Sequence, residues 1–351
     1  MTRLILMITL FSIAMNTQAQ KIYIGTYTDG TSQGVYSYNF DANTGELSDL
    51  ELAIPSVNPS FLSYGLNREV IYAVNEVNNF DQEKSGAVSS FKIEEDGSLS
   101  LLDQSSSFGA HPCHVSFNGS NRIAISNYSG GTVTVFELNA LGTPNLKTVQ
   151  VFNHNANKET SHVHFSQFSE DHLYVSDLGR NSIYAYDLKD ERFSLDTDNL
   201  MSIEEESGPR HFDLFDGKIY ALSEYANTVT VGNIEAGNTA QVISSLPNDF
   251  QGKSYGADIH FSKDHRYLYA SNRGENSIAK FRVLQDGLLE YQEAYDVHGD
   301  WPRNFAIDPT GKWLLVANQR SNNISVFEIQ KSGTLKFKKS YDLGAPVCIL
   351  F

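Results

Sequence analysis

The chain has 351 residues, of which 12% are aromatic, and a formal net charge of −16. Nucleic acids and anionic membranes are bound by basic surfaces, so this acidic composition argues against either as a partner. The sequence has only two cysteines, Cys113 and Cys348. They fall in predicted strands of non-adjacent repeat units, so we expect free, buried thiols rather than a disulfide framework.

The first 19 residues have the order of features found in a secretory signal. Arg3 precedes an apolar run over residues 4–14, and small and polar residues follow as far as Ala19. The apolar run is too short to span a bilayer. We therefore predict that residues 1–19 are removed, that residues 20–351 form one domain, and that the protein is exported, either periplasmic or secreted. The alternative interpretation is a frayed N-terminal extension.

A unit of three strands and their turns is complete in residues 208–231, GPRHFDLFDGKIYALSEYANTVTV. Strands are predicted over residues 210–215, 219–223 and 228–231 because these segments are rich in β-branched and aromatic residues and are bounded by turn residues. Glu224 forms a polar corner after the second strand. A fourth strand follows in most copies, after glycine-containing turns such as Asp96-Gly97 and Asp286-Gly287.

The corner recurs seven times, at intervals of roughly 50 residues, which is typical of four-stranded propeller blades. The corners end at Tyr27, Glu76, Tyr128, Leu178, Tyr225, Arg273 and Gln319. A histidine lies twelve residues before the corner serine in three copies, His114, His164 and His211, and we expect these three to occupy one repeat position.

The two ends of the chain predict how the ring closes. Residues 21–27 are a second strand with no first strand before them, and residues 346–351 are a first strand with nothing after them. If they share a blade, no sheet edge is left open. The sequence therefore predicts an all-β fold: a seven-bladed β-propeller with four-stranded blades, closed by a C-terminal inner strand that joins the N-terminal blade.

This arrangement brings polar residues together at one face of the ring. A first strand begins where its antiparallel partner, the second strand, ends, so the strand starts and the corners lie around the same mouth of the central channel. Three long loops, residues 78–84, 153–161 and 246–256, are expected on that side. The polar residues predicted there are Glu76, His111, His114, Asn127, His162, His164, Asp177, Arg210, His211, Glu224, Arg273, Arg303 and Gln319.

Ten short motifs in blade order resemble the seven-bladed propeller lactonase family, which includes propeller-type 6-phosphogluconolactonases and fungal carboxymuconate-cyclising enzymes. The resemblance covers residues 21–351. The motifs are IGTYT (24–28), NPSFL (58–62), YAVNE (72–76), HPCHVSF (111–117), SNYSGGTVTVF (126–136), DLGRNSI (177–183), GPRHF (208–212), SNRGENSI (271–278), WPRNF (301–305) and LLVANQRSNNISVF (314–327).

The resemblance implies a carboxylic-ester hydrolase of lactonase type, without metal or cofactor, that acts on a small anionic lactone. The family's catalytic positions match His162, Arg210, Glu224 and Arg273. From their predicted place at the channel mouth, we expect six further residues to bind substrate: Glu76, His111, Asn127, Asp177, Arg303 and Gln319. Many relatives have a proline before the histidine, whereas this chain has Glu159, Thr160 and Ser161 there.

These residue types suit the chemistry of lactone opening. A histidine can take a proton from water near neutral pH. Arginines can stabilise the oxygen that becomes anionic, and they form two-pronged contacts with a carboxylate or phosphate. Glu224 could hold an arginine in place or set the tautomer of the histidine.

Each residue also has a structural interpretation. His114, His164 and His211 could serve blade packing, Arg210 and Arg273 could be ion pairs with Glu224 or Asp258, and Asn127 and Asp177 could stabilise turns. A metal at His162 and His164 would need a third ligand that the sequence does not specify.

Three functions remain open from the sequence: hydrolysis of a sugar-acid lactone, a muconate-lactone cyclising reaction, and a non-catalytic secreted binding scaffold, because a fold alone does not fix function. We expect a monomer or a weak homo-oligomer.

Overall fold

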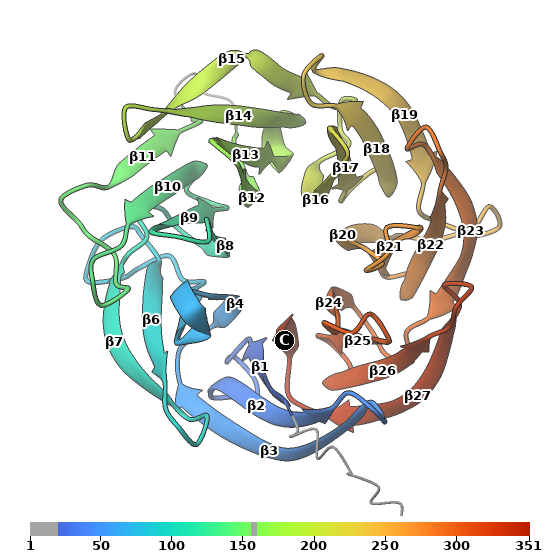
Figure 1. The fold of residues 1–351 in the computed structure, drawn as a ribbon, viewed down its shortest axis with the longest axis horizontal. Coiled ribbons are helices and arrows are strands. Elements are labelled where there is room, and N and C mark those ends of the chain that lie inside the picture. The colour runs from blue at the N-terminus through green and yellow to red at the C-terminus, as the bar shows by residue number, and fades with distance from the viewer. Residues whose placement is uncertain (1–19, 156–159) are drawn as a thin grey trace, which may run out of the picture.

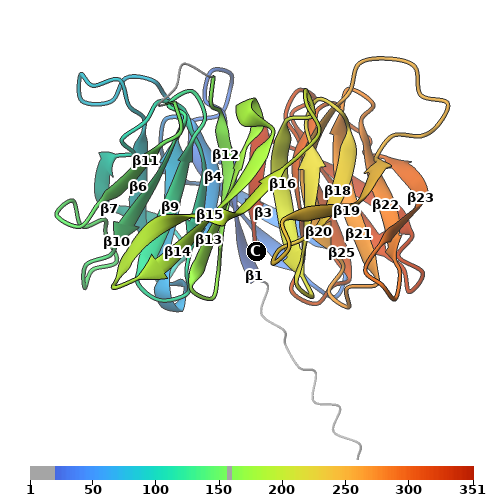
Figure 2. The ribbon, with the colours of Figure 1, turned by 90° about the horizontal axis from the view of Figure 1, so that it is seen from above.

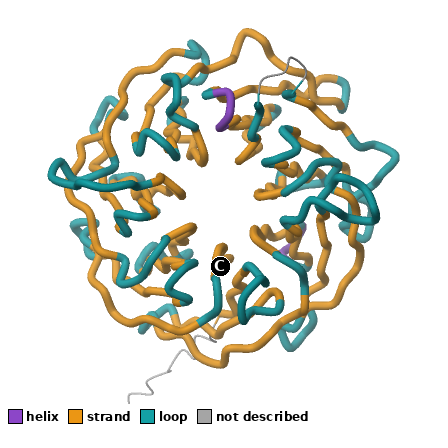
Figure 3. The backbone as a smooth tube through the Cα atoms, turned by 180° about the vertical axis from the view of Figure 1, so that it is seen from behind, coloured by secondary structure: helices purple, strands orange, loops and turns teal. Residues whose placement is uncertain are grey.

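In a computed structural model of the chain, residues 20–155 and 160–351 are described, and they form seven four-stranded antiparallel sheets arranged as blades around a central channel (Figure 1). This confirms the predicted seven-bladed propeller with four-stranded blades. The predicted signal, residues 1–19, lies outside the described residues. The remainder is nearly all strand, with two short 3-10 turns at Leu66–Arg68 and Leu178–Arg180 (Figure 3).

The innermost strand of each blade lines the channel. These strands are β4 (Pro59–Tyr64), β8 (Pro112–Phe117), β12 (Val163–Ser169), β16 (Pro209–Phe215), β20 (Tyr255–Phe261), β24 (Pro302–Ile307) and β28 (Pro346–Leu350). Five of the seven begin at a proline, which lacks the backbone N–H that a strand interior needs and is tolerated as the first residue of a strand. The proline therefore marks the channel mouth at which each of these strands begins.

The second strand of each blade is the most uniformly buried. These strands are β1 (Gln20–Thr26), β5 (Val70–Asn75), β9 (Arg122–Asn127), β13 (His172–Asp177), β17 (Lys218–Ser223), β21 (Tyr267–Arg273) and β25 (Trp313–Asn318). They lie between two strands of their own sheet and between two neighbouring blades, so both faces are apolar. The polar corners that the sequence predicts follow directly at their ends.

The third and fourth strands complete each blade toward the outside. The third strands are β2 (Gly34–Asp41), β6 (Ala87–Ile93), β10 (Thr132–Glu137), β14 (Ser182–Lys189), β18 (Thr228–Asn233), β22 (Ser277–Val283) and β26 (Asn323–Ile329). The outer strands are β3 (Glu46–Pro55), β7 (Leu99–Ser106), β11 (Gln150–Asn153), β15 (Arg192–Ser202), β19 (Asn238–Ser244), β23 (Leu289–Asp296) and β27 (Leu335–Asp342).

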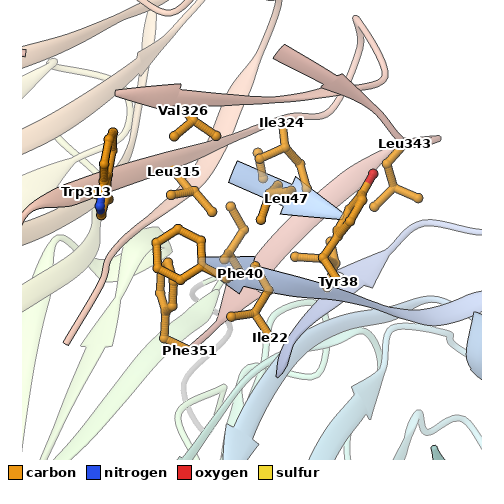
Figure 4. Packing of buried hydrophobic residues seen from close by; sticks show 13 residues of the cluster. Ile22, Tyr38, Phe40, Leu47, Trp313, Leu315, Ile324, Val326, Leu343 and Phe351 are labelled. Atoms are coloured by element: carbon orange, nitrogen blue, oxygen red, sulfur yellow. The ribbon is translucent and has the colours of Figure 1, made fainter. Parts of the chain in front are cut away.

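The ring closes as the terminal segments predict. Strand β28 pairs antiparallel with β1, with Tyr23 opposite Leu350 and Gly25 opposite Cys348. The joint is packed as well as hydrogen-bonded, because Ile22 and Phe40 of the closing blade meet Phe351 and residues of the last blade such as Trp313 (Figure 4). Closure removes the open sheet edge that would expose unpaired backbone groups.

The seams between blades are hydrophobic clusters of this kind, each built from two adjacent sheets. Cys113 and Cys348 are buried and free. The loops over residues 78–84 and 246–254 rise from the same side of the disc, as expected (Figure 2). The loop from Asn153 leads into residues 156–159, which lie outside the described part of the chain.

A one-residue bulge near the start of the inner strands was not predicted. In β16, Pro209 lies opposite Ser223 and His211 lies opposite Leu222, so Arg210 is an extra residue with no partner across the ladder. The same shift leaves Arg303 unpaired in β24, His164 in β12 and Cys113 in β8. A bulge re-aims the side chain of the extra residue.

The bulge corrects one element of the repeat alignment. His164 is the bulged residue of its strand and is therefore equivalent to Arg210, whereas His114 and His211 each follow the bulge. The expectation that His114, His164 and His211 occupy one repeat position is wrong by one residue for His164. Spacing from the corner could not reveal this, because the position of the bulge relative to the histidine differs between blades.

Candidate active site at one mouth of the channel

The centre of the predicted site is a chain of ion pairs that joins two blades. Arg210 is the bulged residue of β16, Glu224 follows β17, and Arg273 ends β21. The carboxylate oxygen Oε2 of Glu224 lies 3.2 Å from Nε of Arg210 and 2.8 Å from Nη2 of Arg273. The structure thus brings together three of the four predicted catalytic residues.

These charges are held largely away from solvent. The side chains of Arg210 and Arg273 are 2% and 5% exposed, and that of Glu224 is 16% exposed. Backbone carbonyl oxygens also accept hydrogen bonds from the two arginines: Arg210 Nη1 donates to Ala257, and Arg273 Nη2 donates to Gly256 at 2.9 Å. Because the guanidinium groups are fixed from several sides, they are preorganised to meet a negative charge at the mouth.

The electrostatics follow from burial and proximity. Burial alone would raise the pKa of Glu224, but Arg273, Arg210 and Arg303 hold it below its ordinary value. Burial, together with Arg273 and Arg303, lowers the pKa of Arg210 to about 9, so this guanidinium is still protonated at neutral pH. The carboxylate and both arginines are therefore charged under physiological conditions.

A second cluster at the same mouth comes from the last blade, which carries Arg303, and from the first two blades, which carry Tyr27 and Glu76. Nη2 of Arg303 lies 3.8 Å from Oε2 of Glu76, and the Tyr27 hydroxyl donates to the same oxygen at 2.8 Å. The guanidinium of Arg303 also lies 5.2 Å from the centre of the Tyr27 ring. Burial would lower the pKa of Arg303, but Tyr27, Glu76 and Glu224 raise it. The two clusters contain three arginines and two glutamates, a net charge of +1.

His162, the predicted base, lies at the rim just before β12. Its ring stacks on Tyr128, with centroids 4.4 Å apart and planes within 11°, and its Nδ1 lies 3.2 Å from the carbonyl oxygen of Tyr128. Tyr128 in turn lies close enough to Tyr225 and Glu224 that both raise its pKa, in addition to the effect of burial. Tyr128 therefore contacts the imidazole directly and lies within electrostatic range of the glutamate.

Asp177 and Asn127 were expected to contact substrate, but the structure buries both side chains completely. Asp177 accepts hydrogen bonds from the backbone N–H of His162 at 2.9 Å, from Ser161 and from His154. Asn127 donates to the carbonyl oxygen of Ser107 and to nearby threonines. Burial gives both residues a supporting role: Asp177 fixes the segment that carries His162, and Asn127 fixes its corner.

The other predicted binding residues line the rim. His111 is half-buried, and its Nδ1 lies 2.9 Å from the Ser129 hydroxyl. Gln319 is half-buried, its backbone N–H donates to Trp301, and its side-chain oxygen has no partner among the described residues. No group of three His, Cys, Asp or Glu side chains that could hold a metal occurs in residues 20–155 and 160–351.

The aromatic residues at the mouth were not predicted from the sequence. They are Tyr27, Tyr128 and Trp301. The centre of the Trp301 ring lies 5.3 Å from the guanidinium carbon of Arg273. A signal was present, since Tyr27, Tyr128 and Tyr225 each end one of the repeated corners. The Tyr27 hydroxyl and ring contact Glu76 and Arg303, and the Tyr128 ring contacts His162. Repeat spacing alone does not indicate these contacts.

The family model for "Lactonase, 7-bladed beta-propeller" matches residues 21–351 of the chain. The chain belongs to the seven-bladed β-propeller lactonase family. A 6-phosphogluconolactonase of Bacillus subtilis is 33% identical over 309 residues, which are 83% of this chain and 86% of that protein. The prediction of a lactonase-type carboxylic-ester hydrolase is thereby confirmed at the level of the family.

Solved structures of the lactonase family match the whole fold. A putative 6-phosphogluconolactonase from Bacteroides fragilis superposes with a TM-score of 0.84 at 31% identity and covers 96% of this chain and 98% of its own. A periplasmic gluconolactonase from Pseudomonas aeruginosa gives a TM-score of 0.85 at 29% identity, covering 94% and 98%. No helix in the described part of this lactonase-family chain is long and apolar enough to cross a membrane.

Proposed function

We propose that this protein hydrolyses a sugar-acid lactone, of the 6-phosphogluconolactone type, at the arginine-lined mouth of its channel, without a metal. One observation carries the proposal: three arginines from three blades converge on one channel mouth in a member of a lactonase family. Several relatives are named for this reaction, among them the 6-phosphogluconolactonase of B. subtilis.

The arginines supply the binding and the charge stabilisation. Two carboxylates neutralise part of the charge of Arg210, Arg273 and Arg303, which leaves a net +1 for an anionic substrate group or for the oxygen that becomes negative during attack. A guanidinium forms two parallel hydrogen bonds with a carboxylate or phosphate. Because the groups are already fixed by backbone carbonyls and by Glu224, little reorganisation is needed during the reaction.

In this proposal His162 acts as the general base. Its imidazole takes a proton from water, the hydroxide oxygen bonds to the lactone carbonyl carbon, and the carbonyl oxygen becomes an anion that faces the arginines. The ring C–O bond then breaks, and the departing oxygen takes up a proton to give the open hydroxy acid. Asp177 supports this role because its carboxylate holds the backbone N–H of His162.

A panel of lactones tests the proposal directly. Purified residues 20–351 should hydrolyse 6-phosphoglucono-δ-lactone or a related aldonolactone faster than a muconolactone carrying carboxylates. A protein that hydrolyses no member of the panel, yet binds a sugar acid, would instead be a binding scaffold. The uncatalysed hydrolysis of each lactone at the same pH is the control.

We also propose that the protein is exported after removal of residues 1–19. The support is the order of charged, apolar and small residues in this segment. The P. aeruginosa relative is named as periplasmic. N-terminal sequencing of the protein from its native host should find a start near Gln20; an intact Met1 would overturn the proposal.

A further inference from the structure

Close to the arginines lies a group of three buried imidazoles, His114, His164 and His211, none of which is more than 4% exposed. The rings of His164 and His211 meet at an angle of 62° with their centroids 5.3 Å apart. The ring of His114 lies 5.9 Å from that of His211. Phe165 packs against both His114 and His211, so the group sits in an apolar wall.

Two nitrogens of this group have no hydrogen-bond partner among the described residues: Nδ1 of His164 and Nε2 of His211. His114 differs, because its Nδ1 accepts from the backbone N–H of Ser166 at 3.4 Å. Leaving a buried polar atom unpaired is destabilising, so buried atoms of this kind normally have a partner. The two unpaired atoms lie on rings whose centroids are 5.3 Å apart, close enough for one ligand atom to contact both.

Asp258 determines what kind of partner His211 needs. Nδ1 of His211 lies 2.7 Å from Oδ1 of Asp258, and the same carboxylate accepts from Asn304 at 2.6 Å and from His260 at 3.1 Å. These partners keep Asp258 ionised, with a pKa well below its ordinary value despite its burial. Nδ1 of His211 therefore carries the proton.

The other nitrogen of His211 is consequently a hydrogen-bond acceptor. Burial and the adjacent Arg210 lower the pKa of His211 to about 4, so its ring is neutral at physiological pH. A neutral imidazole protonated on Nδ1 has only a lone pair on Nε2. The missing partner must be a donor, and the positive charges of Arg210, Arg273 and Arg303, which act on neighbouring His164, disfavour a cationic one.

We propose that a hydroxyl group binds between Nε2 of His211 and Nδ1 of His164, donating its hydrogen bond to His211. The hydroxyl comes from the substrate or from a bound water molecule. If it comes from the substrate, the inference rests on the proposed lactonase function and refines it. The preferred substrate would then be both anionic and hydroxylated, as a phosphorylated sugar-acid lactone is and a muconolactone is not.

The substitution His211→Asn tests this pairing. An asparagine amide can still donate to Asp258, but it removes the Nε2 acceptor. His114→Asn is the matched control, since it makes the same change in a neighbouring ring whose nitrogen is already hydrogen-bonded. Denaturant unfolding of both variants checks that each is folded.

The kinetic readout compares two lactones with the same six-membered ring, D-glucono-δ-lactone and the hydroxyl-free δ-valerolactone. If the substrate supplies the hydroxyl, His211→Asn lowers kcat/KM for gluconolactone roughly 10-fold, the size of one neutral hydrogen bond, and leaves valerolactone unchanged. If water supplies it, both substrates lose activity to the same extent. Parent-like kcat/KM for gluconolactone in His211→Asn would overturn the proposal.

A crystallographic readout does not depend on activity. High-resolution crystals of the parent, with and without gluconate, should show an oxygen within hydrogen-bond distance of Nε2 of His211. An oxygen already present without gluconate identifies water, and one that appears only with gluconate identifies the sugar acid. If neither crystal contains such an oxygen, the hydroxyl site is wrong, even if the parent is an active lactonase. If the parent hydrolyses no lactone of the panel, 6-phosphoglucono-δ-lactone included, the proposed function fails and these crystals alone decide the hydroxyl site.

Discussion

Glu224 should be the residue of the site on which folding stability depends most, because it is the shared counter-ion of two buried arginines. The substitution Glu224→Gln keeps the shape of the side chain and removes its charge. Its distances of 3.2 and 2.8 Å to the two guanidinium groups correspond to about 5–6 kcal/mol of attraction each at an effective dielectric constant of about 20. Desolvation of the three groups offsets much of this attraction.

The net cost of Glu224→Gln should therefore be about 3–5 kcal/mol of unfolding free energy, the range for breaking a buried pair and leaving a charge behind. Urea denaturation at pH 7 measures it. Glu290→Gln is the matched control, because Glu290 lies 2.7 Å from Arg282 but both side chains are about half exposed. Breaking that exposed pair should cost less than about 1 kcal/mol.

Phosphate binding by the variant and the pH dependence of the parent's stability provide two further checks. Phosphate at about 100 times its Kd should restore about 2.7 kcal/mol, because it replaces the lost negative charge. The pKa of Glu224 is lowered from 4.5 in the folded protein. The stabilisation by Glu224 is thus fully present above pH 4.5 and is lost as the pH falls through the lower, folded-state pKa. A variant within 1 kcal/mol of the parent at pH 7 and insensitive to phosphate would refute the reasoning.

Three other outcomes are expected. His162→Ala should lower kcat roughly 100-fold or more with little change in unfolding free energy; full activity would reject His162 as the base and make His164 the next candidate. Arg273→Met should raise KM for an anionic lactone more than it lowers kcat, because a charge-assisted pair with the substrate stabilises the ground state and the transition state alike. Initial-rate kinetics measure this effect, and a neutral lactone is the control substrate. Deleting residues 346–351 should abolish the cooperative urea transition, because β1 loses its partner strand and the buried Val347 and Ile349 are removed; a truncated protein as stable as the parent would contradict this.

Much of the fold could be predicted from the sequence because the same pattern of strands and turns recurs seven times. Each unit places β-branched and aromatic residues in short runs, with glycine at the turns between its outer strands, as at Gly97 and Gly287, where φ is positive. The split terminal blade could also be predicted, since residues 346–351 supply the first strand and residues 21–27 the second strand of one unit. Local composition and periodicity are sufficient for such a repeat.

The approximate location of the site also followed from strand order. Arg210 at a strand start and Glu224 and Arg273 at corners must lie near one another if first and second strands are antiparallel neighbours. The sequence could not decide which of these groups pair. Glu224 pairs with Arg210 of its own blade and with Arg273 of the next, whereas Glu76 contacts Arg303 and Tyr27. The pairs between blades depend on how the blades pack against one another.

Only the tertiary structure decided the roles of the histidines. His114, His164 and His211 look equivalent in the sequence because each lies twelve residues before a corner serine. The bulge at the start of the inner strands makes His164 equivalent to Arg210 instead, and the neighbouring rings of His164 and His211 each have a nitrogen without a partner among the described residues. A bulge changes register without changing local composition, so its position is set by how an inner strand packs against its neighbours around the channel and not by the residues of the strand itself.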